Sequence, residues 1–165
     1  MPHPYPATYW IDRLQLTTHV EGGSFCEYYR SSLLVDSTPH SGKRNSSTGI
    51  YFLLQQGQFS AFHRIASDEL WHLYYGDPLL VYELEPTGEL VIHQLGNRPD
   101  LEQQFHCVIK AGNWFASAPA AGSEYSLCGC TVSPGFDYAD FRLAERQALL
   151  SQFPQHSSLI LSLTR

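Results

Sequence analysis

His63 and Glu69 are the two residues whose types and spacing point most directly to chemistry. A β-rich run over residues 60–65 places His63 and Ile65 on one strand face, residues 66–68 form a short turn, and Glu69 opens the neighbouring strand. Both side chains can therefore face one cavity. A carboxylate beside an imidazole raises the pKa of the imidazole and orients its proton, which suits general-base catalysis. A buried carboxylate rarely lacks a partner or a function, so Glu69 is the more informative of the two.

Tyr125 is the residue that we expect to complete this site from a different strand. It begins a β-rich run over residues 125–132, in which alternation gives Leu127 and Gly129 the same direction as Tyr125. We predict that its side chain faces the same cavity and acts as the acid opposite the base.

Trp71 and His72 lie on opposite faces of the strand that Glu69 opens. Trp71 shares the face of Glu69, where it is either a stacking wall for a ring-shaped ligand or a part of the core. His72 lies three residues after Glu69, so strand parity turns it away from the cavity. We do not expect His72 to be a metal ligand.

Glu21, Arg30 and Tyr51 are further candidate ligand contacts. Glu21 precedes two glycines, which form either a simple turn or a place where the backbone approaches a ligand that Glu21 faces. Arg30 lies in a β-rich run over residues 25–31, and a guanidinium at a polar barrel mouth suits a carboxylate or phosphate. Tyr51 lies in a similar run over residues 48–55.

The four cysteines form no CxxC pair, and a chain of 165 residues needs no disulfide framework to fold. Cys128 and Cys130 lie two apart in a predicted strand, so they share a face. We interpret them as small buried hydrophobic residues rather than as ligands of a soft metal.

The elements that must position these residues are mostly strands. A helix is predicted over residues 8–16, and helical composition returns over residues 144–153 before Pro154. Short strands without intervening helices indicate an antiparallel sandwich or barrel, and no linker divides residues 1–165 into more than one domain. The nine predicted strands cover residues 25–31, 48–55, 60–65, 69–74, 79–84, 90–94, 105–109, 113–117 and 125–132.

The spacing from Gly57 to Gly76 resembles the first sequence motif of the cupins, in which a glycine, two histidines, a glutamate and a second glycine recur at fixed intervals. His63 and Glu69 occupy a histidine and the glutamate position, and Ile65 takes the place of the second histidine. In the second motif, Tyr125 stands where the last histidine ligand is expected. The resemblance implies an all-β cupin double-stranded β-helix, a jelly-roll barrel, with a short N-terminal helix and a C-terminal helical tail.

Several ordered blocks between about residues 8 and 141 resemble one cupin subfamily, the cupin-5 or DUF985 family. This resemblance implies a homodimer but no known reaction, because members resemble both sugar-nucleotide epimerases and seed storage proteins in fold. The blocks are His19-Val20-Glu21-Gly22-Gly23, Tyr29-Arg30-Ser31, residues 48–54, residues 60–71, Gly76-Asp77-Pro78-Leu79 and residues 132–141 with Pro134-Gly135-Phe136.

Three functions are consistent with these residues. The first is an enzyme for a small polar molecule, a sugar epimerase or isomerase, with His63 as base, Glu69 orienting it or sharing its proton, and Tyr125 as acid. The second is a metal-dependent oxygenase in which His63, Glu69 and one further ligand hold a divalent metal; two of four expected ligands are missing. The third is a non-catalytic protein that binds or stores a ligand.

The composition of the chain indicates which kinds of partner it can bind. A net charge of -6 and the absence of a basic run argue against nucleic acid. No apolar stretch approaches the ~20 residues of a membrane span, and residues 1–6 resemble no secretion leader, so we expect a cytoplasmic protein. Leu70, His72 and Tyr74 are predicted to point outward together, a combination unusual on a solvated face, and this also favours a homodimer.

Overall fold

The computed structural model of the chain describes residues 3–36, 40 and 42–165. Its strands are β1 (Thr17–Thr18), β2 (Ser24–Arg30), β3 (Leu34–Asp36), β4 (Lys43–Asn45), β5 (Thr48–Gln55), β6 (Ser60–Arg64), β7 (Asp68–Gly76), β8 (Leu79–Leu84), β9 (Leu90–Leu95), β10 (His106–Ile109), β11 (Trp114–Pro119), β12 (Tyr125–Ser133) and β13 (Arg142–Leu143). All nine predicted strands are present within one or two residues at most ends. Residues 1–2 of the N-terminal segment, and residues 37–39 and 41, lie outside the described part of the chain.

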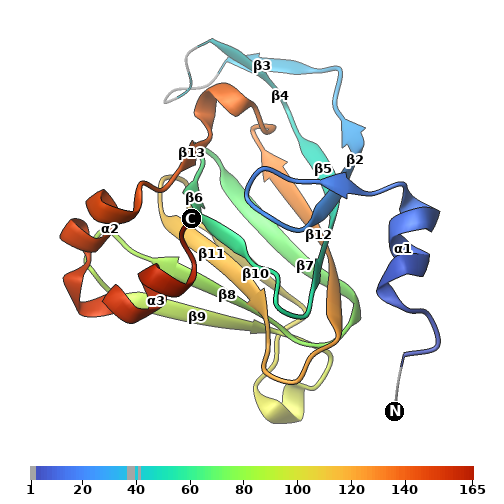
Figure 1. Cartoon of the computed structure of the whole chain (residues 1–165). Helices are drawn as coiled ribbons and strands as arrows, with labels where there is room; N and C mark the ends of the chain where they lie inside the picture. The colour runs from blue at the N-terminus through green and yellow to red at the C-terminus, as the bar shows by residue number, and fades with distance from the viewer. Residues whose placement is uncertain (1–2, 37–39, 41) are drawn as a thin grey trace.

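Two antiparallel sheets face each other and form a barrel (Figure 1). The six-stranded sheet has the order β1-β2-β5-β12-β7-β10, and the five-stranded sheet has the order β13-β6-β11-β8-β9. Strands β3 and β4 form a separate hairpin, which stands at the top of Figure 1. The mainly β fold predicted from the sequence is confirmed.

The barrel interior is filled by the residues that alternate inward along both sheets. Phe52 and Trp71 of the six-stranded sheet pack with Val81 and Phe115 of the five-stranded sheet in one buried cluster. Cys128 and Cys130 belong to the same cluster, as their shared strand face predicts, and the described chain holds all four cysteines as free thiols. Burial of this apolar surface is the main favourable contribution to folding.

Helices cover the outer faces of both sheets. Helix α1 (Ala7–Leu14) packs on the six-stranded sheet through a cluster that includes Trp10 and Leu127. Helices α2 (Arg146–Gln152) and α3 (Ser157–Ser162) cover the five-stranded sheet, so that α1 lies on one side of the barrel and α2 and α3 lie on the other (Figure 1). Short 3-10 helices cover Pro99–Leu101, Tyr138–Asp140 and Pro154–His156. The predicted tail helix is confirmed, whereas α3 was not predicted.

The connection from β6 to β7 differs from the sequence prediction. The sequence suggested that these two strands are neighbours, but β6 belongs to the five-stranded sheet and β7 to the six-stranded sheet. Residues 65–67 therefore turn a corner of the barrel. His63 and Glu69 consequently approach the interior from opposite walls rather than from adjacent strands.

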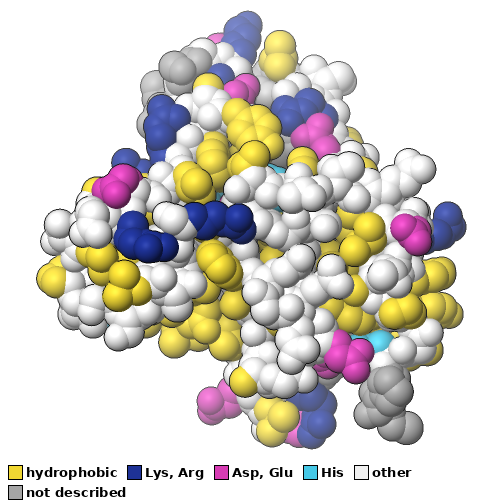
Figure 2. All heavy atoms as spheres, in the orientation of Figure 1, with side chains coloured by type: hydrophobic (Ala, Val, Ile, Leu, Met, Phe, Trp, Pro, Cys, Tyr) yellow, Lys and Arg dark blue, Asp and Glu magenta, His cyan; other side chains and the backbone are white. Residues whose placement is uncertain are grey.

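Charged side chains are spread over the surface. On the face in Figure 2, Lys and Arg side chains occupy several separate places, and Asp and Glu side chains lie close to some of them. Among the described residues, no helix is both long enough and apolar enough to cross a membrane.

Candidate active site

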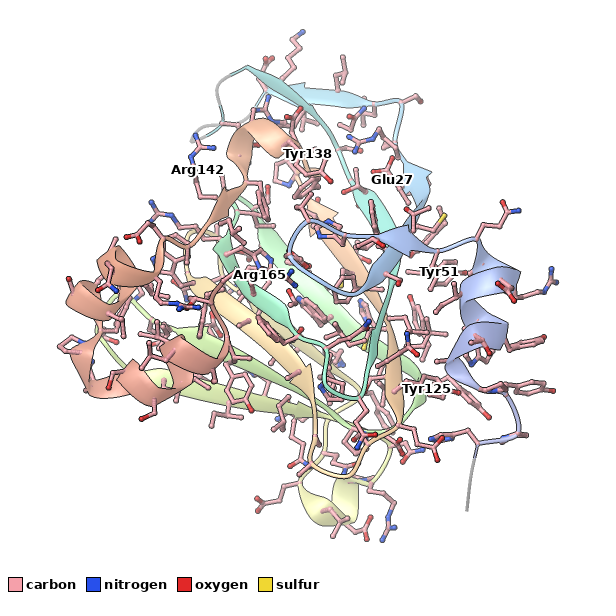
Figure 3. The ribbon with its side chains drawn as sticks, in the orientation of Figure 1. Glu27, Tyr51, Tyr125, Tyr138, Arg142 and Arg165 are labelled. Carbon is pink, nitrogen blue, oxygen red and sulfur yellow. The ribbon has the colours of Figure 1, made fainter. Side chains whose placement is uncertain are left out.

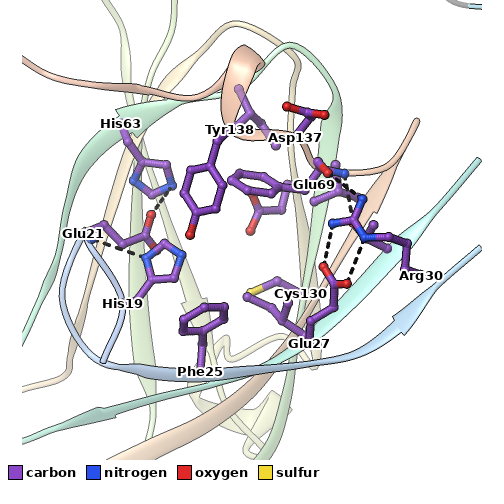
Figure 4. Close-up of a pocket in the computed structure, with 15 residues that line it drawn as sticks. His19, Glu21, Phe25, Glu27, Arg30, His63, Glu69, Cys130, Asp137 and Tyr138 are labelled. Atoms are coloured by element: carbon purple, nitrogen blue, oxygen red, sulfur yellow. Dashed lines mark hydrogen bonds and ion pairs between the residues drawn. The ribbon is translucent and has the colours of Figure 1, made fainter. Parts of the chain in front are cut away.

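A cavity of about 310 Å³ lies in the barrel, and Figure 4 shows the residues that line it. This volume is at the lower end of the range for small-molecule sites. Its walls come from the turn before β2, from strands β2, β5, β6, β7 and β12, and from the segment after β12. The lining residues are His19, Glu21, Phe25, Glu27, Arg30, Thr48, Ile50, His63, Ile65, Glu69, Cys130, Val132, Phe136, Asp137 and Tyr138.

Glu21 and His63 form a buried pair on one wall. His63 Nε2 lies 3.0 Å from Glu21 Oε2, and the two side chains are 3% and 7% exposed. His63 Nδ1 lies 2.7 Å from the carbonyl oxygen of Ala61. A carbonyl only accepts hydrogen bonds, so Nδ1 carries a proton, and the short contact at Nε2 then requires a second proton between His63 and Glu21.

The shared proton belongs to His63, so the two side chains form an ion pair of an imidazolium and a carboxylate. Burial lowers the pKa of His63, but the charge of Glu21 and its hydrogen bond outweigh burial and leave that pKa above its ordinary value. Burial raises the pKa of Glu21, but the charge and hydrogen bond of His63 leave it below its ordinary value. The expected carboxylate partner of His63 was Glu69; the structure gives this position to Glu21.

Two glycines hold Glu21 in place. Gly22 has φ of +113°, and a Cβ atom there would lie 2.1 Å from the carbonyl oxygen of Phe59. The Glu21 carbonyl accepts a hydrogen bond of 2.8 Å from the N–H of Ala61, at the start of the strand that carries His63. The turn therefore needs positive φ, as the first of the two alternatives requires, and Glu21 faces the cavity, whereas the close neighbours of Gly22 are Phe59 and Arg165.

His19 is a neutral imidazole beside this pair. Its Nδ1 accepts a hydrogen bond of 3.3 Å from the backbone N–H of Glu21. Burial lowers the pKa of His19, and the nearby charge of His63 lowers it further, against the opposing effect of Glu21. His19 was not predicted from the sequence as a site residue, although it lies in the same block as Glu21 and only two residues before it.

Glu69 faces the cavity from the opposite wall, where it is 7% exposed. Burial raises its pKa to about 7; the charge of His63 lowers this value, the charge of Glu21 raises it, and a hydrogen bond with Cys130 lowers it. Burial also raises the pKa of Cys130 well above its ordinary value, so its thiol stays protonated and donates to Glu69. Glu69 can thus gain or lose a proton near neutral pH, as an acid–base catalyst requires.

Arg30 and Glu27 stand at the mouth of the cavity as a two-point ion pair. Arg30 Nε and Nη2 donate to the two carboxylate oxygens of Glu27 at 2.9 and 2.7 Å. Arg30 Nη1 donates to Asn45 Oδ1 at 2.9 Å and to the carbonyl oxygen of Phe136 at 3.1 Å. Arg30 lines the cavity as predicted, but the protein itself already uses most of its hydrogen-bonding capacity.

Asp137 and Tyr138 close the cavity from the segment after β12. Figure 4 shows the hydroxyl of Tyr138 pointing into the space between the His63 wall and Glu69. The Tyr138 ring packs edge-on against Phe136, with centroids 5.0 Å apart. Tyr138 was not predicted from the sequence as a site residue; the available signal was the block of residues 132–141 in the resemblance, which contains it.

The expectation that Tyr125 faces this cavity is wrong. Tyr125 and Leu127 do share a direction, but that direction is outward, towards helix α1. The Tyr125 hydroxyl accepts a hydrogen bond of 3.1 Å from Trp10 Nε1 and donates to the carbonyl oxygen of Tyr5. Alternation places Cys130 and Val132 of the same strand on the inner face.

Tyr51 and Trp71 also lie away from the cavity. Tyr51 is on the outer face of the six-stranded sheet, where its ring centroid is 4.7 Å from that of Tyr28. Figure 3 shows Tyr51 and Tyr125 on the side of α1, apart from Glu27 and Tyr138 at the cavity end. Trp71 does face inward, but it is buried in the core without lining the cavity.

His72 lies on the outer face, opposite Trp71, as parity predicted. It pairs in register with His106 of β10, and the ring centroids are 6.2 Å apart. Burial lowers the pKa of His72, and the charge of His106 lowers it further.

The cavity residues do not fit the divalent metal site considered from the sequence. Both ring nitrogens of His63 are engaged, one by Ala61 and one by Glu21. Within the described chain, no group of three or more His, Cys, Asp and Glu side chains has an arrangement that could hold a metal ion. The arrangement instead resembles a proton-transfer site, with a charged pair on one wall and a titrating carboxyl on the other.

Comparisons with known proteins agree with this fold. A hypothetical protein from Leishmania major is 33% identical, with a TM-score of 0.92 over 96% of this chain and 98% of its own. A Shewanella oneidensis protein is 38% identical, with a TM-score of 0.89 over 97% of this chain and 98% of its own. Oxalate decarboxylase from Bacillus subtilis shares the fold, with a TM-score of 0.56 at 14% identity over 88% of this chain and 36% of its own.

No curated protein matches the chain. Residues 8–144 match the family described as the cupin superfamily, DUF985. The matched residues include both walls of the cavity and exclude the last helices. The match agrees with the resemblance of the sequence blocks, and the barrel agrees with the fold that the resemblance implied. The chain therefore belongs to the DUF985 family of the cupin superfamily.

Proposed function

We propose that this protein binds a small polar molecule in its barrel and isomerises or epimerises it by proton transfer. The observation that carries the proposal is Glu69, a buried carboxyl with a pKa of about 7 that faces the same cavity as the ion pair of His63 and Glu21. A group with a pKa near the operating pH is best able both to take and to return a proton.

Glu69 is the proposed base that removes a proton from a carbon next to a carbonyl group. The hydroxyl of Tyr138 is the proposed donor to the substrate oxygen on which negative charge develops, because both N–H groups of His63 are already engaged by Glu21 and Ala61. The imidazolium of His63 is proposed to supply positive charge on the wall beside that oxygen. Return of the proton from Glu69 to the neighbouring carbon on the same face completes an isomerisation. Return to the original carbon completes an epimerisation only after the planar intermediate has turned over in the cavity, so that its other face meets Glu69. The hydroxyl of Tyr138, at the cavity mouth, is positioned to orient the substrate.

Exchange of substrate hydrogen for deuterium tests this proposal whatever the product is, because the exchange reports the proton-removal step itself. The protein is incubated in deuterated buffer with a panel of aldoses, ketoses and hydroxyketones, and the carbon-bound hydrogen next to the carbonyl is followed by NMR. We expect exchange with at least one compound, reduced by about 10²- to 10⁴-fold in Glu69→Gln and in His63→Gln, as is typical for loss of an acid–base group.

His72→Gln provides the matched control, since it removes a histidine from the outer face of the same strand that carries Glu69. Exchange that persists unchanged in Glu69→Gln would contradict the proposed role of this carboxyl. Saturable binding of a panel compound without any exchange would instead support the ligand-binding alternative.

A further inference from the structure

The charges around the cavity are unequal, and this bears on what can enter it. Among the lining residues in the described chain, Arg30 is the one Lys or Arg side chain, whereas four carboxylates, Glu21, Glu27, Glu69 and Asp137, line the same space. The charge of Glu21 is balanced by His63, with which it shares a proton. Whether the cavity can attract an anion therefore depends on whether the positive charge of Arg30 is available to a ligand.

Arg30 is not available, because the protein occupies four of its five N–H donors. Two of these bind the carboxylate of Glu27, and two bind Asn45 and the carbonyl oxygen of Phe136. The two-point geometry is the one by which arginine normally recognises a carboxylate or phosphate ligand. Glu27 thus occupies the place that an anionic ligand would need (Figure 4).

With the Arg30 charge neutralised, the field in the cavity is set by Asp137 and by Glu69 in its ionised form. Coulomb repulsion disfavours an anion in such a site, and the partly buried position weakens screening by salt. Several of the other lining residues are apolar, among them Phe25, Ile50 and Val132. Apolar walls beside a few polar groups suit an uncharged molecule with one less polar face.

We infer that Glu27 makes this cavity reject anions, by occupying Arg30, and that the substrate enters as an uncharged molecule without a phosphate or carboxylate group. The statement about the substrate rests on the proposed function; the rejection of anions does not. Glu27 is therefore a specificity-determining residue. Arg30, expected from the sequence to suit a carboxylate or phosphate of the ligand, instead binds the carboxylate of Glu27.

Inorganic phosphate can test whether the cavity rejects anions. It is added above neutral pH, and the NMR signals of the Arg30 Nε–H and of the cavity backbone amides are followed. For the wild-type protein we expect no saturable change at these signals. Glu27→Gln keeps the shape of the side chain and removes its charge, so phosphate should bind at the freed guanidinium at least about tenfold more tightly, as a charge-assisted hydrogen bond provides. The double variant Glu27→Gln, Arg30→Gln should lose this gain.

Asp100→Asn is the matched control, because Asp100 holds Arg98 by the same two-point ion pair away from the cavity. This substitution frees an arginine and removes one negative charge. Because the freed arginine lies away from the cavity, adding phosphate should not change the NMR signals of the cavity groups. Phosphate binding in the wild-type cavity as tight as in Glu27→Gln would overturn the inference, and so would a Glu27→Gln variant that is folded and gains nothing. The deuterium-exchange experiment reports on Glu69 and His63 and not on Arg30 or Glu27, so its failure leaves the phosphate result interpretable.

Discussion

Glu69 is buried in the barrel, and no lysine or arginine side chain of the described residues pairs with it. The charge of His63 stabilises the Glu69 carboxylate, the charge of Glu21 destabilises it, and the Cys130 thiol donates a hydrogen bond to it. Burial outweighs the two stabilising contributions and raises the pKa from an ordinary 4.5 to about 7. Ionisation of a buried carboxyl with a raised pKa destabilises the folded state. Such a group is typical of a functional site rather than of a structural one.

This predicts a specific pH dependence of stability. Between pH 4.5 and about 7 the folded protein holds a proton on Glu69 that the unfolded chain has released, so raising the pH through this window favours unfolding. The shift corresponds to about 3 kcal/mol, at about 1.4 kcal/mol for each pKa unit. Glu69→Gln should remove this loss, so that the variant gains stability relative to the wild type as the pH rises.

Urea unfolding of both proteins below and above this window measures the effect. Glu124→Gln serves as the control, since it removes a carboxylate from an exposed position on the same chain. A stability difference between wild type and Glu69→Gln that stays constant from acid to alkaline pH would show that Glu69 titrates like an exposed glutamate.

At the scale of elements, the turn between β1 and β2 determines the geometry of the His63 pair. It holds Glu21 through the backbone bond to Ala61 and through Arg165, whose Nη2 donates to the Glu21 carbonyl at 3.2 Å. Gly22 fits between these groups because it lacks a Cβ atom, which would lie 2.4 Å from Arg165 Nη2. Arg165, which is labelled in Figure 3, thus supports a cavity residue that lies far from it in the sequence.

Gly22→Ala should therefore disturb both stability and the His63 pair. The backbone conformation alone disfavours alanine by about 1–3 kcal/mol, and the contact with Phe59 adds to this cost. Displacement of Glu21 should lower the pKa of His63, measured by NMR titration of the imidazole. Gly57→Ala is the control: Gly57 also has positive φ, of +79°, but a Cβ atom there meets nothing within 4 Å. Equal effects of the two substitutions would contradict the role of the Gly22 turn.

At the scale of the whole molecule, the outer face of the six-stranded sheet carries exposed aromatic rings beyond the area that α1 covers. Tyr28 and Tyr74 are 49% and 48% exposed. Their rings lie against the sheet, since Cβ atoms at Gly49 and Gly129 would come within 2.7 and 2.2 Å of the two hydroxyl oxygens. A flat aromatic surface of this kind is characteristic of protein interfaces.

We propose that this face joins two copies of the chain into a homodimer. Light scattering should give twice the chain mass of 18.6 kDa at micromolar concentration. Tyr74→Lys should shift the protein towards a monomer, because it places a charge in the apolar contact. Leu161→Lys, at a similarly exposed residue of α3 on the opposite side of the barrel, should leave the dimer intact. A wild-type monomer would contradict the proposal.

Local pattern was sufficient to predict much of this protein. Alternation of side chains and turn residues placed all nine main strands, because strand parity and turn chemistry are properties of neighbouring residues. The same parity placed Cys128 with Cys130 and separated His72 from Trp71. The spacing of His63 and Glu69 predicted one shared cavity, and the structure has it.

The tertiary structure determines which face of each strand turns inward, which strand parity alone does not. Parity shows which residues of a strand share a face, but not which face turns inward, and this depends on what packs against the sheet. Helix α1 covers the face that carries Tyr125, so that residue became part of the outer cluster and not of the cavity. The partner of His63 is Glu21 because the turn at residues 65–67 crosses between sheets, and a segment more than forty residues earlier then fills the space beside the imidazole. Such long-range contacts depend on chain folding in three dimensions, which the spacing of residues along the sequence does not encode.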